Sequence, residues 1–357
     1  MTDIVLRKRS RLPAYLAAAL LLAGAAWAGT WHFATARLAA ALDTWIAREH
    51  EAGRDWACPE RAISGFPLRI EIVCDAPTLT IAGADGATRI GARRIATVAQ
   101  VWQPNQADVA ITTPAFATRA DGSVATLDAG GASAQLRVSP LDYPKVLDRL
   151  SLSFVDPVVT VTAAGQVAAS ARAAKVEAHL RATAGRAKAD GAFDIAATVR
   201  QLNSPMLDAL AKTGDPVEAE LAALVIGLDL PGRGNGVARL EAWRLANGAL
   251  DVTRLSLVKG AAKLETSGRL SLDAEHRAAG QIDVKAEGLD ALLAQFGIPA
   301  AKLDIGSALS MLAGKKKQAD PQAVATAAPS IRLPLVLREG RIYVGPIPTP
   351  VKLVPLY

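Results

Sequence analysis

The sequence predicts a mainly-β protein: an N-terminal transmembrane helix followed by an elongated, curved antiparallel β-sheet, as a groove or a sandwich, with a few short helices. Two observations predict this fold class. Residues 12–36 are apolar and contain no Asp, Glu, Lys or Arg. From residue 54 onward, short alternating runs of apolar and polar residues are separated by turn residues roughly every 8–12 positions, which is typical of antiparallel β-proteins.

Residues 12–36 are predicted to be a membrane anchor. As a helix rising ~1.5 Å per residue, this segment is about 37 Å long, enough to cross a ~30 Å hydrocarbon core. Basic residues stay on the cytoplasmic side, so we expect residues 1–11 to be a cytoplasmic tail and the rest of the chain to be periplasmic, held at the inner membrane. The basic residues are Arg7, Lys8, Arg9 and Arg11, and the aromatic residues near the ends of the span are Tyr15, Trp27 and Trp31.

A cleaved signal peptide is the alternative interpretation of this segment. Residues 16–26 resemble an h-region, and Ala26-Trp27-Ala28 resembles a cleavage site. Against cleavage, apolar residues continue at helical spacing beyond residue 36, which predicts an amphipathic stalk helix over residues 37–53. The residues that continue this pattern are Leu38, Leu42, Trp45 and Ile46. The pattern favours a retained anchor, and both interpretations export the remainder of the chain.

We treat residues 54–357 as one mainly-β domain, and the composition of the chain limits the kind of core and surface that this domain can have. The 357 residues are 51% hydrophobic but only 4% aromatic, so small and branched side chains must build any core. The net charge of +6 comes partly from the residues before the anchor, and other charges of both signs are interspersed. That distribution is typical of a solvated surface rather than of a nucleic-acid-binding protein.

The most distinctive segment contains both cysteines of the chain. Apolar side chains alternate from Phe66 to Cys74, which predicts a strand with one buried face, carrying Phe66, Leu68, Ile70, Ile72 and Cys74. Cys58 is the one available partner for Cys74, and cysteine pairs in an oxidising compartment are normally disulfide-bonded. Such a bond stabilises by ~3 kcal/mol in the chain-entropy model. A redox pair or a metal site is disfavoured, because the spacing is not C-x-x-C and no His lies between the cysteines.

Further strands are predicted in order along the chain. They cover residues 78–81, 94–98, 108–111, 134–138, 152–155 and 158–162. The Ala-rich residues 167–180 are compatible with either a helix or a strand. Two similar units follow, in which an alternating strand leads into a Leu-rich helix: residues 189–199 with 205–212, and residues 278–288 with 289–296.

Between these units, Asn247-Gly248 predicts a hairpin over residues 245–252, because Asn-Gly favours two-residue hairpin turns. Strands over 255–258, 262–266 and 268–272 and a helix over 301–312 complete this region. Residues 314–330 are polar and lack an apolar period, which predicts a flexible loop. The last hairpin pairs residues 333–337 with 341–344 around Glu339-Gly340, and the prolines of residues 345–350 are expected to end it.

Residues that could carry chemistry do not converge in the sequence. His32, His50, His179 and His276 share no metal-ligand spacing. The chain contains no G-x-S-x-G, H-E-x-x-H or C-x-x-C motif and no P-loop. We therefore predict no catalytic residues, no cofactor, no metal and no enzymatic activity.

Two sets of residues carry resemblances to known families. The set Trp56, Cys58, Gly65, Phe66, Pro67, Arg69, Cys74, Gly340, Gly345 and Pro346 resembles the bacterial domain-of-unknown-function family number 2125. The rhythm of residues 245–284 is similar to AsmA-like envelope proteins. The second resemblance implies an anchor in the inner membrane of a Gram-negative cell, a long sheet curled into an apolar groove, and a link to lipid traffic. This chain is shorter than the large AsmA-like proteins and would not bridge the periplasm alone.

Two functions are compatible with these expectations. The first is a membrane-anchored periplasmic protein whose curved sheet binds lipid or another apolar ligand. The second is a structural or assembly factor that docks other envelope proteins and binds no small ligand. In both, the expected partner is the membrane, with no nucleic acid.

Overall fold

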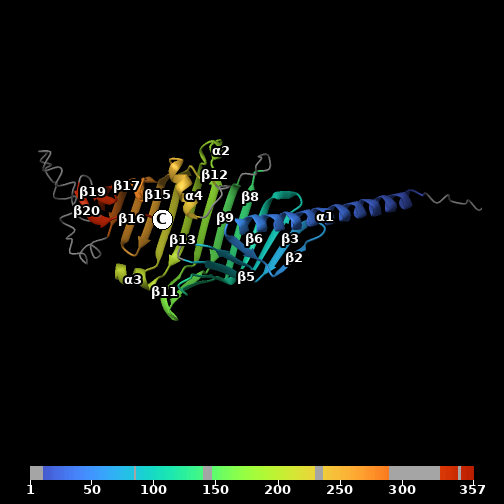
Figure 1. The fold of residues 1–357 in the computed structure, drawn as a ribbon, viewed down its shortest axis with the longest axis horizontal. Coiled ribbons are helices and arrows are strands. Elements are labelled where there is room, and N and C mark those ends of the chain that lie inside the picture. The colour runs from blue at the N-terminus through green and yellow to red at the C-terminus, as the bar shows by residue number, and fades with distance from the viewer. Residues whose placement is uncertain (1–10, 84–85, 140–146, 230–235, 289–329, 345–346) are drawn as a thin grey trace, which may run out of the picture.

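The protein is described by a computed structural model over residues 11–83, 86–139, 147–229, 236–288, 330–344 and 347–357. In these ranges it consists of four helices and one antiparallel sheet of twenty strands, which does not close into a barrel. Figure 1 shows the sheet extending from α1 at one end of the molecule to β19 and β20 at the other. The predicted fold class is confirmed: a long apolar N-terminal helix precedes a mainly-β region.

Helix α1 (Leu12–Glu51) is continuous through the predicted anchor and stalk. Residues 12–27 are exposed along their whole length, whereas one stripe of the helix is half-buried or buried from Ala28 onward. That stripe consists of Ala28, Trp31, Thr35, Leu38, Ala39, Leu42, Ile46 and Glu49. Packing on the β region therefore begins inside the predicted span rather than at residue 37.

The main layer of the sheet contains fifteen strands, each paired with the next. In spatial order they are β2 (Glu60–Ser64), β3 (Arg69–Asp75), β5 (Thr88–Gln100), β6 (Gln103–Thr118), β8 (Gly131–Val138), β9 (Leu147–Val155), β12 (Lys175–Ala182), β13 (Phe193–Leu202), β14 (Val217–Ile226), β15 (Ala249–Lys259), β16 (Ala262–Leu272), β17 (Ala278–Glu287), β18 (Ser330–Arg338), β19 (Arg341–Val344) and β20 (Ile347–Lys352). Most neighbours in space are consecutive strands in the sequence, and the exceptions are the pairs β3–β5, β6–β8 and β9–β12.

A second arm of the sheet branches from the long strands β5 and β6. One end of each strand pairs in the main layer, and the other end pairs with β4 (Thr78–Ile81) or β7 (Val124–Asp128). The arm continues to β1 (Arg54–Ala57) on one side and to β10 (Val158–Ala163) and β11 (Gln166–Arg172) on the other. It returns to the main layer at an isolated bridge between Arg172 and Asn203, so the N-terminal half of the sheet is partly two-layered.

The main layer has one apolar and one polar face. In register across β8, β9, β12 and β13 lie Leu136, Leu150, Leu180 and Ile195. Parallel rows contain Leu221 beside Leu255 and Leu257 beside Leu264. The alternate positions are polar, for example Ser256, Glu265 and Lys285 in one row. This alternation is expected of an antiparallel sheet with one face turned to water.

The core of the described chain is small and is built mainly from Ala and Val. The buried apolar residues are Val73, Ala92, Ala132, Ala173, Ala192, Phe193, Val217, Ala223, Val225, Ala249, Ala286 and Leu337. Phe193, at 2% exposed, is the largest of them. The leucine rows of the apolar face are half-buried, apart from Leu136, which is 37% exposed, so these side chains are not packed as in a domain interior.

The predicted strand over residues 66–74 is too long by three residues. β3 begins at Arg69, and Phe66 and Leu68 lie in the preceding turn with 52% and 53% of their surface exposed. The turn forms because Gly65 adopts φ +105° and its carbonyl accepts a hydrogen bond from the Arg69 N–H at 3.2 Å. The apolar–polar alternation of the sequence continues through these residues, although they form a turn and not a strand. Val73, expected on the polar face, is the buried residue of β3.

The hairpin predicted at Asn247-Gly248 is also wrong. These residues end helix α4 (Gly236–Leu245) and lead into β15. Asn247 is left-handed at φ +53°, and the Gly248 N–H donates to the Trp243 carbonyl at 2.8 Å. Asn and Gly serve a helix C-terminus for the same reason that they serve a hairpin turn, since both require positive φ.

Several other segments differ from expectation in extent. The ambiguous residues 167–180 form β11 and β12, and the strands predicted over 255–272 form two long strands, β15 and β16. β20 passes through Pro348 and Pro350, where the prolines were expected to end pairing. Proline is tolerated there because an edge strand leaves one row of N–H groups unpaired.

The described residues test some of the predicted short helices and the last hairpin. α3 (Pro205–Ala211) confirms the helix predicted over 205–212, and α2 (Ala187–Asp190) was not predicted. The final hairpin turns at Glu339-Gly340 as expected. The helices predicted over 289–296 and 301–312, most of the loop over 314–330, the tail residues 1–10, and Gly345 and Pro346 lie outside the described residues.

Candidate functional site

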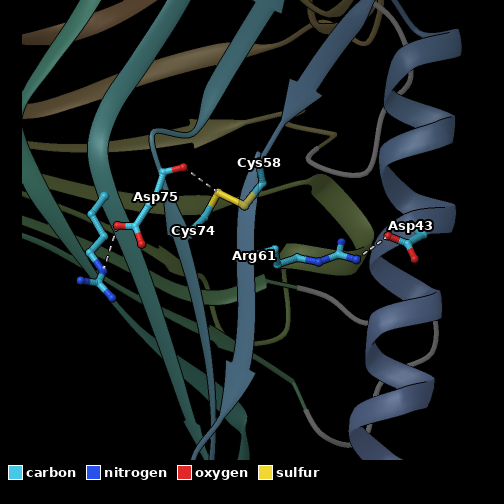
Figure 2. Close-up of a disulfide and its surroundings, with 6 residues drawn as sticks. Asp43, Cys58, Arg61, Cys74 and Asp75 are labelled. Carbon is cyan, nitrogen blue, oxygen red and sulfur yellow. Dashed lines mark hydrogen bonds and ion pairs between the residues drawn. A yellow bond between two sulfur atoms is a disulfide. The ribbon is translucent and has the colours of Figure 1, made fainter.

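The candidate site is the junction between α1 and the first strands of the sheet. Cys58, in the connection from β1 to β2, is disulfide-bonded to Cys74 of β3, as the sequence predicts, with the two Cα atoms 5.7 Å apart. Arg61 of β2 lies in register with Cys74 and forms an ion pair with Asp43 of α1 at 2.8 Å. Figure 2 shows α1 running alongside β2, with the disulfide on the other side of that strand from the helix.

The C-terminal end of α1 is held by β1. The rings of Trp45 and Trp56 have their centroids 5.4 Å apart. Arg54 donates two hydrogen bonds to the Glu49 carboxylate, at 2.5 and 2.8 Å. These hydrogen bonds to Arg54 hold the pKa of Glu49 below its usual value. Because both side chains are largely shielded from solvent, this end of the helix is fixed to the sheet by aromatic and charged contacts together.

The other end of the junction is formed by the turn Gly65–Leu68. The Trp27 indole N–H donates to the Pro67 carbonyl at 2.9 Å, and the Trp31 indole N–H donates to the Arg69 carbonyl at 3.3 Å. The Phe66 ring meets Trp31 edge to face at 5.6 Å. A side chain on Gly65 would place its Cβ 2.7 Å from the Arg69 carbonyl oxygen, so the turn requires glycine.

The residues that carry the family resemblance are therefore divided in space. Trp56, Cys58, Gly65, Phe66, Pro67, Arg69 and Cys74 all belong to the junction. Gly340 lies in the β18–β19 turn, where its missing Cβ leaves room for Arg277. Sequence reasoning did not identify Trp27 and Trp31 as the partners of this motif. Their spacing of one helical turn was available in the sequence, but nothing local indicated what they would contact.

A family model described as "Uncharacterized protein conserved in bacteria (DUF2125)" matches residues 31–351. The chain belongs to this family. The match begins at Trp31, one of the two α1 tryptophans that contact the motif turn, and extends into β20. Neither the curated proteins nor the solved structures contain a match to the chain.

The described part of this DUF2125 chain has further hollows on both faces of its sheet. On the apolar face, a small cavity of about 250 Å³ lies between the second arm and the main layer, lined by residues that include Leu127, Phe154, Val159, Val176 and Leu202. On the polar face, two larger hollows have volumes of about 690 and 530 Å³. Their linings include Arg254, Glu265 and Lys285 in the first, and Asp108, Gln135 and His179 in the second.

A cluster of polar side chains lies where Tyr357 of the DUF2125 chain meets α4. Glu241 of α4 accepts hydrogen bonds from Arg244, at 2.6 and 2.8 Å, and from the Tyr357 hydroxyl at 2.9 Å. The Tyr357 ring stacks on His276, with centroids 4.4 Å apart. Hydrogen bonding to Arg244 and then to Tyr357 lowers the pKa of Glu241 to about 2. This carboxylate stays ionised and holds the end of the chain against α4.

Proposed function

We propose that this DUF2125 protein is anchored in the inner membrane, exposes residues 54–357 to the periplasm as one domain, and binds lipid or another apolar ligand on the apolar face of its sheet. The observation that carries the proposal is the set of leucine rows running from β8 to β16, in which Leu136 is exposed and the other leucines are half-buried. Contiguous apolar surface of this kind in a soluble domain marks a binding site. The AsmA-like rhythm of residues 245–284 supports the same function.

The position of α1 supports a ligand that comes from the membrane. Ile72 and Cys74 of β3 lie on the same face as Leu136, because the register through β5, β6 and β8 carries that face across the sheet. Arg61, on this face, contacts α1. The apolar face therefore starts beneath a helix that is long and apolar enough to span a bilayer. An acyl chain leaving the membrane beside α1 would meet a continuous apolar surface, whose burial is worth ~25 cal/mol per Å².

Photocrosslinking in cells tests the ligand directly. Each variant would carry a photoreactive amino acid at a single position. The positions form three pairs of adjacent residues: Leu180 and His179, Leu255 and Arg254, and Leu264 and Glu265. The first residue of each pair is half-buried on the apolar face, and the second is exposed on the polar face. We expect lipid adducts by mass spectrometry from the apolar positions alone. Equal labelling of both faces, or no lipid adduct from any apolar position, would contradict the proposal.

The alternative is a structural or assembly factor that docks other envelope proteins without a small ligand. The open, charged hollows of the polar face favour this second candidate, because they present ion-pairing groups to solvent. Specific protein adducts at the His179, Arg254 or Glu265 positions, without lipid at their apolar neighbours, would establish it in place of the first. In either case we propose that the protein has no enzymatic activity.

A further inference from the structure

Large apolar side chains project into solvent at one tip of the sheet. Phe66 and Leu68 in the β2–β3 turn are 52% and 53% exposed, and Trp102 in the β5–β6 turn is 65% exposed. The two turns lie side by side, because the Val101 N–H donates to the Leu68 carbonyl at 3.1 Å. Isolated exposed apolar residues need no explanation, but three large ones on adjoining turns form a patch. We call these three residues the apolar tip.

The apolar tip lies against α1 where the helix leaves the β region. Trp27 and Trp31 donate their indole N–H groups to backbone carbonyls at the turn, and Phe66 packs on Trp31. Residues 12–26 extend beyond this point and are exposed. The last helical turn in contact with the tip is thus also the first turn available to a membrane.

The length of the free helix sets the depth of the tip. From Leu12 to Trp27 the helix is about 24 Å long at ~1.5 Å per residue. A hydrocarbon core is ~30 Å thick, so the free segment alone is too short to cross it. Continuing to Trp31 brings the length to about 30 Å, and tilting the helix would only increase the deficit. A bilayer spanned by α1 must therefore extend to the level of Trp31 and Phe66.

We infer that the apolar tip is inserted into the interface of the leaflet on the β-domain side, beside Trp27 and Trp31. This inference rests on the proposed anchoring by α1 and assigns a role to the turn of the DUF2125 motif. Aromatic rings favour this interface, where one edge is apolar and the other is hydrated. Arg69, whose side chain is 59% exposed, directly follows the tip. Its guanidinium forms an ion pair with Glu71 at 3.4 Å and remains exposed enough to hydrogen-bond a lipid phosphate as well.

Site-directed spin labelling of the full-length protein in phosphatidylglycerol-containing phosphatidylethanolamine vesicles tests this placement. Single variants Leu68→Cys and Trp102→Cys would carry the label at the tip. Val167→Cys, 66% exposed in the β10–β11 hairpin, is the matched control for an exposed apolar position in a turn region away from α1. Leu20→Cys, 73% exposed on the free helix, reports the span itself. Accessibility to oxygen and to a water-soluble nickel chelate measures membrane exposure at each position.

We expect the oxygen-to-nickel accessibility ratio to be several-fold higher at positions 68, 102 and 20 than at position 167. A water-like ratio at 68 and 102 with a membrane-like ratio at 20 would overturn the inserted tip and leave the anchor intact. A water-like ratio at 20 would overturn both. Quenching by brominated lipids checks the result without a label: Trp102→Phe should remove part of the quenchable fluorescence, and an unchanged quenched fraction would also contradict insertion.

Discussion

At the scale of single residues, three tryptophans of α1 decide how the helix meets the sheet. Trp27 and Trp31 give their indole N–H groups to the turn Gly65–Leu68, and Trp45 packs on Trp56. Each of these large rings is a rigid contact of low entropic cost with a defined direction for its polar edge. Together with the disulfide, these contacts define how α1 meets the first strands of the sheet.

Loss of the disulfide should lower the free energy of unfolding of the protein. Cys58→Ser, Cys74→Ser and the double variant should each lower the free energy of unfolding by about 2–4 kcal/mol, because the unfolded chain regains the entropy of the open loop. Thermal melting of the full-length protein in detergent measures this, and reductant should lower the midpoint of the parent in the same way. The double variant should melt no lower than the singles. Thiol labelling of both cysteines without reductant would show that the bond is absent.

The Glu241 cluster predicts a pH-dependent contribution to stability. The pKa of Glu241 is about 2, below its ordinary value of 4.5. A group whose pKa is lowered by folding stabilises the protein above the unfolded pKa, and this contribution is lost as the pH falls through the folded value. Glu241→Gln should therefore melt below the parent at neutral pH, and the difference should shrink between pH 4.5 and about 2. A difference that is constant over this range would contradict the assignment.

At the scale of elements, α1 has two parts with different surroundings. Residues 12–26 are exposed, whereas Trp27 contacts the turn Gly65–Leu68 and one stripe from Ala28 to Glu49 is half-buried or buried. The helix does not change its backbone where its role changes, since i to i−4 hydrogen bonding is the same in lipid and in water. The division between the exposed and the packed part of α1 is therefore made by the partner surface and not by the helix.

The contact between α1 and β1 predicts energetic coupling between Trp45 and Trp56. In a double-mutant cycle with alanine, their effects on unfolding should be non-additive by about 0.5–1.5 kcal/mol, the range for paired aromatic rings. Trp102→Ala is the control partner for Trp45→Ala, because Trp102 follows Val101, which hydrogen-bonds the Leu68 carbonyl in the turn at the other end of the junction. Additivity of Trp45 with Trp56 would mean that the helix end is not held by this pair.

At the scale of the whole molecule, the sheet is extended and one-sided. The second arm lies against part of its apolar face, α1 contacts Arg61 on that face, and the leucine rows remain half-buried or exposed. A sheet of this kind gains little from a conventional core, which explains why the buried residues are mostly Ala and Val. An apolar ligand on the exposed rows would supply part of the burial that the chain itself does not.

The orientation of the molecule is tested with reporter fusions. The basic residues before the span predict that the C-terminus lies outside the cytoplasm. Alkaline phosphatase fused after Tyr357 should be active, and the same enzyme fused before the span should be inactive. Green fluorescence from a C-terminal fusion, together with inactive phosphatase there, would reverse the topology and with it the proposed location.

The sequence by itself determined the apolar helix, the antiparallel β class, the final hairpin and the pairing of two cysteines. These follow from local periodicity and from having one possible partner, so a single segment contains the information. The start of the strand over 66–74 and the hairpin over 245–252 were wrong for a related reason. Alternation and Asn-Gly are each compatible with more than one local structure, and distant contacts select among them.

Only the tertiary structure decided that Phe66 meets Trp31, that Trp243 and Gly248 end a helix together, and that the leucine rows align across strands that are distant in sequence. Local propensities differ by a fraction of a kcal/mol per residue, which is too little to fix an ambiguous segment. Burial of large side chains against a partner is worth several times more. The arrangement of the junction and of the apolar face therefore depends on surfaces that no single segment of the sequence contains.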